Sequence, residues 1–117
     1  MLKELLAKLI PQSQVDELVR TELKSILEVC KPVCIFLFGS AARGTMTTAS
    51  DLDFLVVLPD NTDLKDVKQK FYCRRPALDC SVDIIFMHKS SFDTKSRLGG
   101  VPMICRQEGL IVFGGME

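Results

Sequence analysis

The 117-residue sequence has no excess of either charge, because 15 basic side chains balance 15 acidic ones. A chain without bulk charge gives no general indication of a nucleic-acid or membrane partner. It also lacks any apolar run of the roughly 18 residues that a membrane-spanning helix needs. Its charged first residues lack the apolar block of a secretory signal. We therefore expect a cytoplasmic protein with one domain over residues 1–117.

The common metal-binding and phosphate-binding motifs are missing as well. The five cysteines contain no C-x-x-C pair, and His88 is the one histidine. Zinc is therefore a weak alternative, and most of the cysteines are expected to be reduced and buried. Both glycine-rich phosphate loops, G-x-x-x-x-G-K and G-x-G-x-x-G, are absent. We expect His88 to lie at the rim of a strand or to cap a helix.

The order of apolar runs and amphipathic stretches predicts a mixed α/β fold, a small mixed sheet of about four strands flanked by helices. Strands are predicted at 33–38, 52–58, 82–87 and 110–113. Helices are predicted at 2–10, 12–29, 40–43, 63–75 and 90–107. The last helix is irregular, because Gly99, Gly100 and Pro102 fall inside it.

Two aspartates at the start of the second predicted strand are the first candidates for chemistry. Asp51 and Asp53 are two residues apart, so their side chains point to the same side of a strand. Aspartate is disfavoured in strands, and two neighbouring carboxylates repel each other. A pair of Mg²⁺ or Mn²⁺ ions would supply the missing positive charge. The alternative is a polar strand end at which Asp51 caps a turn.

A third acid, Asp83, is the second residue of another apolar strand, the position that Asp53 has in its own strand. If these two strands are neighbours, three carboxylates converge at one end of the sheet. Three acids at the end of apolar strands are hard to explain without a cation. Taken alone, Asp83 could simply be a charge at a sheet edge.

The turn after the first predicted strand is a candidate anion site. Gly39 and Ser40 end that strand and begin a short helix, which exposes free backbone N–H groups at the positive end of the helix dipole. Such a position suits phosphate, and Arg43 lies one helical turn further on. The alternative is a simple helix cap with Arg43 in solvent.

These residues together resemble a known family. Gly39-Ser40, then Asp51-Leu52-Asp53, then Asp83 on a later strand, resembles the nucleotidyltransferase superfamily that includes DNA polymerase β. The string Gly39-Ser40-Ala41-Ala42-Arg43-Gly44 resembles its smallest members, the minimal nucleotidyltransferases. These are often encoded beside a HEPN-domain partner, whose antitoxin they are. The resemblance extends from about Val15 to Phe113.

The resemblance implies a nucleotidyltransferase fold, with an N-terminal helical segment at 1–30 and a catalytic core at 33–113. It implies an enzyme that transfers a nucleoside monophosphate, most plausibly AMP from ATP, to a hydroxyl and releases pyrophosphate. Two Mg²⁺ or Mn²⁺ ions would assist. By position, Asp51 and Asp53 would bind both metals, and Asp83 would bind the catalytic metal and help deprotonate the acceptor. Gly39, Ser40 and Arg43 would contact the phosphates.

Partners also follow from the resemblance. Besides the nucleoside triphosphate, the acceptor can be a tyrosine on a HEPN-type partner toxin. The alternative function is a binding module that neutralises a HEPN ribonuclease by direct contact, without catalysis. Association with a second copy of the chain is a further expectation. One departure from small relatives is the stretch from Gly99 to Pro102, where they usually continue a charged helix.

Overall fold

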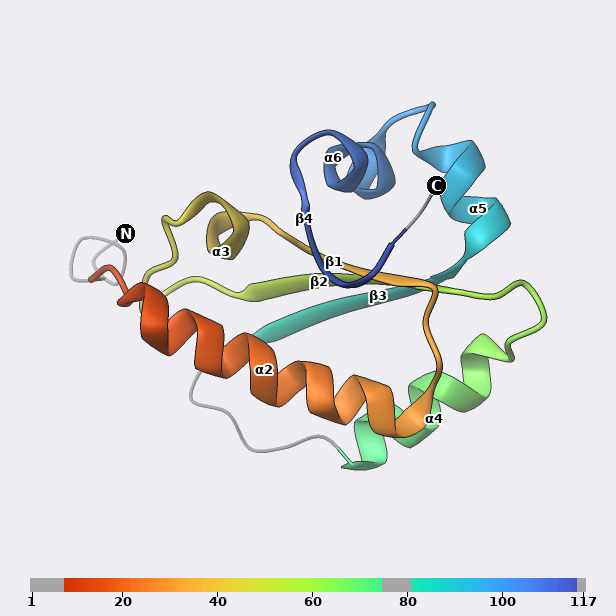
Figure 1. Cartoon of the computed structure of the whole chain (residues 1–117), viewed down its shortest axis with the longest axis horizontal. Helices are drawn as coiled ribbons and strands as arrows, with labels where there is room; N and C mark the ends of the chain where they lie inside the picture. The colour runs from red at the N-terminus through yellow and green to blue at the C-terminus, as the bar shows by residue number, and fades with distance from the viewer. Residues whose placement is uncertain (1–7, 75–80, 116–117) are drawn as a thin grey trace.

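The structure is a computed structural model, and it describes residues 8–74 and 81–115. Figure 1 shows the arrangement of its elements. The strands are β1 (Cys34–Phe38), β2 (Leu52–Leu58), β3 (Val82–His88) and β4 (Leu110–Gly114). The helices are α2 (Gln12–Val29), α3 (Ser40–Arg43), α4 (Leu64–Arg74), α5 (Lys89–Lys95) and α6 (Gly100–Glu108).

The strands form one mixed sheet in the order β3-β2-β1-β4. β1 lies between β2 and β4 and is antiparallel to both, whereas β2 and β3 are parallel. Parallel neighbours cannot be joined by a tight turn, so the chain crosses through α4 between β2 and β3. This topology confirms the predicted mixed α/β class. It also aligns the first residues of β2 and β3, which carry two of the three acids.

Helices cover both faces of the sheet, with α2 and α4 on one side and α5 and α6 on the other (Figure 1). The residues of β2 alternate between two hydrophobic clusters. Leu52, Phe54 and Val56 pack in the cluster with residues of α2 and α4. Leu55 and Val57 pack in the cluster with residues of α5 and α6. Burial on both faces explains why β2 is almost continuously apolar.

Two predicted helices differ from the structure. The region 90–107 is divided between α5 and α6, because Gly99 and Gly100 have φ values of +133° and +74°. An α-helix requires negative φ, so no continuous helix can pass through these two residues. The predicted helix at 2–10 is wrong at its end, where Leu9 forms a β-bridge with Thr47. Residues 2–7 lie outside the described residues.

Other predicted boundaries shift by a residue. β1 begins at Cys34, β3 continues to His88, and α4 begins at Leu64. Asp63 precedes α4 because its carboxylate accepts hydrogen bonds from the backbone N–H groups of Lys65 and Asp66. No helix in the described part of the chain is both long and apolar enough to cross a bilayer.

The four cysteines of the described ranges are free thiols. Cys34 and Cys105 are buried and Cys30 is half-buried, as predicted, whereas Cys73 is exposed. Burial raises the pKa of Cys30 to about 11. Burial also raises the pKa of Cys105 to about 12, with smaller contributions from the nearby Cys34 and Asp53. These thiols are therefore protonated and weakly nucleophilic at neutral pH. Cys80 lies outside the described residues.

Candidate active site

The turn that follows β1 brings the two halves of the predicted site together. Phe38, the last residue of β1, pairs with Asp53 of β2. The next residue, Gly39, has a φ of +74° and a ψ of −152°, a conformation that residues with a side chain rarely adopt. A Cβ atom at Gly39 would collide with the Asp53 carboxylate. The glycine therefore leaves the space that Asp53 occupies, and the turn lies directly beside the acid.

The short helix α3 starts at this turn. It is closed by Gly44, which has a left-handed φ of +74°, and by a hydrogen bond of 2.9 Å from the Thr45 N–H to the Ser40 carbonyl. No side chain caps its first turn. The N–H groups of that turn therefore stay available to an anion. Ser40 is half-buried at the start of α3, and Arg43 is exposed at its end.

The acids lie at the starts of the two parallel strands. Asp53 is the second residue of β2 and pairs in register with Asp83, the second residue of β3. The register is held just before this pair by a hydrogen bond of 2.9 Å from the Leu52 N–H to the Ser81 carbonyl. Strand alternation places both acids on the α5 and α6 side of the sheet. Asp51 is exposed and immediately precedes β2.

The charges of these residues affect one another. The pKa of Asp53 is raised from 3.8 to about 6, first by burial and then by the negative charges of Asp83 and Asp51. The positive charge of Arg43 acts in the opposite direction. Like charges this close disfavour ionisation of the most buried carboxyl. The site therefore carries an excess of negative charge at neutral pH.

The donor set suits a hard divalent cation. Asp51, Asp53 and Asp83 offer only carboxylate oxygens, which are the ligands that Mg²⁺ prefers. A cation there would also offset the repulsion that raises the pKa of Asp53. Within residues 8–74 and 81–115, however, no three His, Cys, Asp or Glu side chains are gathered closely enough to hold an ion. The acids lie side by side along the strand ends, and metal binding by them stays a prediction.

Comparison with known proteins identifies the family. The sequence pattern of the nucleotidyltransferase domain family matches residues 16–107 of the chain. The chain belongs to the nucleotidyltransferase domain family. No curated protein matches its sequence.

Solved structures show the same fold as this nucleotidyltransferase domain. A candidate nucleotidyltransferase from Sulfolobus solfataricus superposes with a TM-score of 0.60 at 17% identity, over 88% of this chain and 83% of that one. A toxin–antitoxin complex with AMP-PNP gives a TM-score of 0.55 at 23% identity, over 83% and 73%. A toxin–antitoxin pair MntA–HpeT, with two aspartates two positions apart changed to glutamate, gives 0.51 at 18%, over 92% and 75%.

The six residues predicted for the site come together in part. Gly39 touches Asp53, Asp53 pairs with Asp83, and the charges of Asp51 and Arg43 both reach Asp53. Ser40 follows Gly39 directly in the chain. The grouping of the acids depended on the condition that β2 and β3 are neighbours, and the structure meets this condition. The role of each residue in binding or catalysis stays a prediction.

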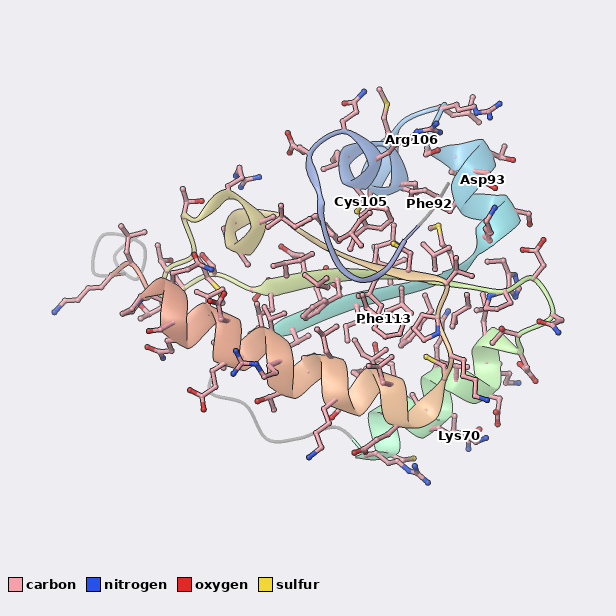
Figure 2. All side chains as sticks on the ribbon, viewed as in Figure 1. Lys70, Phe92, Asp93, Cys105, Arg106 and Phe113 are labelled. Atoms are coloured by element: carbon pink, nitrogen blue, oxygen red, sulfur yellow. The ribbon has the colours of Figure 1, made fainter. Side chains whose placement is uncertain are left out.

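Cys105 is the residue near the site that sequence reasoning missed. It lies on the side of α6 that faces the sheet (Figure 2) and is fully buried. It is close enough to Asp53 for the charge of that carboxylate to contribute to its raised pKa. The nucleotidyltransferase domain thus has a buried, protonated thiol, Cys105, close to Asp53. No sequence signal marks it, because the broken helical pattern gave no register for α6.

Proposed function

We propose that this nucleotidyltransferase domain, residues 1–117 as one unit, transfers AMP from ATP to a hydroxyl acceptor with the help of Mg²⁺ or Mn²⁺. The observation that carries the proposal is the pairing of Asp53 with Asp83 beside the Gly39 turn. Membership of the nucleotidyltransferase domain family supports it. The AMP-PNP in one structural neighbour, an ATP analogue, supports ATP as the donor.

The reaction is a displacement at the α-phosphorus. The acceptor hydroxyl oxygen forms a bond to that phosphorus, and the bond from phosphorus to the bridging oxygen of pyrophosphate breaks. Pyrophosphate leaves with the electron pair, and the hydroxyl proton passes to the Asp83 carboxylate. Gly39 and Ser40 bind the outer phosphates, with Arg43 as a further cation. Divalent ions held by the three acids would neutralise charge on the attacking and leaving oxygens.

We propose a tyrosine on a HEPN-type partner toxin as the acceptor. Two structural neighbours are toxin–antitoxin assemblies. In one of them two aspartates two positions apart were changed, a spacing that matches Asp51 and Asp53 here.

The test is transfer of label from α-labelled ATP to a HEPN-type partner in the presence of Mg²⁺. We expect Asp51→Asn and Asp53→Asn to lower transfer by at least about 100-fold, because each removes a charged ligand of ions that stabilise the transition state. Asp66→Asn is a matched control, since Asp66 is an exposed acid on α4 paired with Lys70. Unchanged transfer in the Asp51 and Asp53 variants would contradict this site.

A non-catalytic binding module is the second candidate. It is favoured by the absence, among the described residues, of three ligand side chains gathered around one point. A variant with all three acids changed to asparagine separates the two functions. If it still binds and neutralises the partner as well as the wild type does, direct contact is the function. If neutralisation is lost while binding remains, catalysis is the function.

A further inference from the structure

We propose that Thr47 and Ser50 are positioning residues that hold Asp51 in place for metal binding. The inference rests on the proposed role of Asp51 as a metal ligand. Asp51 is exposed and lies outside the regular pairing of β2, so its place depends on the backbone at either side. On one side lies the loop from Thr45 to Ser50. On the other side lies Leu52, whose N–H is bonded to the Ser81 carbonyl.

Side-chain hydroxyls close this loop into a tight turn. The Thr47 N–H donates to Ser50 Oγ at 3.0 Å, and the Ser50 N–H donates back to the Thr47 carbonyl at 3.0 Å. The two hydroxyl oxygens are 3.1 Å apart and hydrogen-bonded. The Ala49 N–H donates to Thr47 Oγ1 at 3.2 Å. Thr47 and Ser50 therefore bond each other reciprocally, and Asp51 is the next residue in the chain.

The turn is also attached to the rest of the molecule. The Ile10 N–H donates to the Met46 carbonyl at 2.9 Å, and the Thr48 N–H donates to the Lys8 carbonyl at 3.0 Å. Met46 is fully buried in the core. A loop anchored both by a buried side chain and by a second segment of chain loses little further entropy when a ligand binds. The backbone that leads into Asp51 is therefore held in place before any cation arrives.

Residues behind metal ligands commonly act in this way. Groups that orient a ligand side chain strengthen metal binding, and their removal typically weakens it by about 10- to 100-fold. Ser50→Ala removes the acceptor of the Thr47 N–H and one partner of the hydroxyl pair. Thr47→Val removes the other hydroxyl and keeps the shape. Both variants keep Asp51, Asp53 and Asp83. A loss of Mn²⁺ affinity would therefore come from a displaced Asp51 and not from a missing carboxylate.

The experiment measures Mn²⁺ binding to the whole chain, without nucleotide, from the electron paramagnetic resonance signal of free Mn²⁺. We expect Ser50→Ala to weaken binding by about 10- to 100-fold and Thr47→Val by about tenfold. Ser50→Thr keeps a hydroxyl and should retain most of the affinity. Thr48→Val is the matched control, because the Thr48 hydroxyl accepts a hydrogen bond from the Lys8 N–H at 3.4 Å and lies outside the Thr47–Ser50 hydroxyl pair. It should bind Mn²⁺ as the wild type does.

A purely structural role would give a different result. If Ser50→Ala binds Mn²⁺ like the wild type while Asp51→Asn does not, the positioning role is wrong and the proposed active site stands. If Asp51→Asn also binds like the wild type, both proposals fail. Should Ser50→Ala fail to fold, Thr47→Val and Thr48→Val still test the proposal. Both replace a threonine by a valine of similar volume, at neighbouring positions in the chain. Equal affinities in these two variants would then overturn it.

Discussion

At the scale of single residues, Asp53 combines three conditions that are individually unfavourable. It is half-buried, it pairs with another acid, and it lies against a turn that only glycine can form. The raised pKa is the measurable result. Such a group costs stability and persists where function requires it. The protein therefore gathers negative charge where we propose that a metal and a triphosphate bind.

This condition predicts a pH-dependent stability. Between 3.8 and about 6, folded Asp53 holds more of its proton than unfolded Asp53 does, so its contribution to stability falls as the pH rises through this window. We expect Asp53→Asn to raise the free energy of unfolding at pH 8 by about 1 kcal/mol, a value reduced for its partial solvent exposure. Urea unfolding in chelator at pH 8 and pH 4 checks this. A gain of equal size at pH 4 would contradict it.

Spacing in the sequence was sufficient to find these acids, because period-2 alternation and a shared position in two strands are visible in the residues themselves. The contact between Gly39 and Asp53 was not predictable. It depends on the register that pairs Phe38 with Asp53, and register is set by side-chain packing across strands. Cys105 was missed because the sequence gives no register for α6, and so does not show that Cys105 packs on residues of β1 and β2.

At the scale of elements, α5 depends on a residue from outside itself. Its own N-cap position, His88, makes no capping hydrogen bond. Instead, Asp60 from the loop after β2 accepts the Ser90 N–H at 3.0 Å. The His88 ring donates from Nε2 to the Thr62 carbonyl at 2.7 Å. His88 thus lies at the rim of β3, one of its two expected places, whereas Asp60 caps α5 and His88 fixes the loop that holds Asp60.

Asp60 should contribute stability at neutral pH. The hydrogen bond from the Ser90 backbone is the main cause that lowers its pKa, so its contribution is present above the unfolded pKa and is lost as the pH falls through the folded one. We expect Asp60→Ala to lower the urea midpoint at pH 7, and Asp60→Asn to lower it less, because asparagine still caps. Measurement at a pH below the lowered pKa should show no difference between wild type and Asp60→Asn. If the urea midpoints still differ at that pH, the effect of Asp60→Asn comes from side-chain packing and not from the charge of Asp60.

Helix propensity and hydrophobic periodicity predicted most helices and strands, but they failed where glycines determine the end of a helix. The split between α5 and α6 follows from positive φ at Gly99 and Gly100, and a sequence shows that a glycine is present but not which φ it takes. The helix predicted at 2–10 was wrong at Leu9 for a different reason. Its leucines favour a helix, whereas pairing with the Thr47 loop imposes an extended backbone.

At the scale of the whole molecule, β4 is an edge strand with apolar side chains in solvent. Leu110, Ile111 and Phe113 are 49%, 51% and 37% exposed. The segment from Gly109 to Gly115 carries no charge. Charged residues normally protect such edges from pairing with another strand. An uncharged, apolar edge fits an identical edge, so we predict that two copies of the chain pair through β4.

Sedimentation velocity over a range of concentrations tests this pairing. We expect Ile111→Lys to raise the dissociation constant of the dimer by at least about tenfold, because a charge is placed on the shared edge. Leu27→Lys is the control, since Leu27 is also an exposed leucine, at 39%, but lies on α2 and not on β4. A wild-type chain that stays monomeric at all concentrations would contradict the prediction. So would equal effects of the two substitutions.

The parallel pairing of β2 with β3 has a consequence for how the protein folds. Asp53 and Asp83 are 30 positions apart along the chain, and they meet through β2 and β3, the parallel pair among the described strands. Closing so long a loop is entropically slow compared with pairing β1 and β2, which are joined by a shorter connection. The acids should therefore meet after β1 and β2 have paired. A refolding chain would form its local helices and the β1–β2 pair before Asp53 and Asp83 come together.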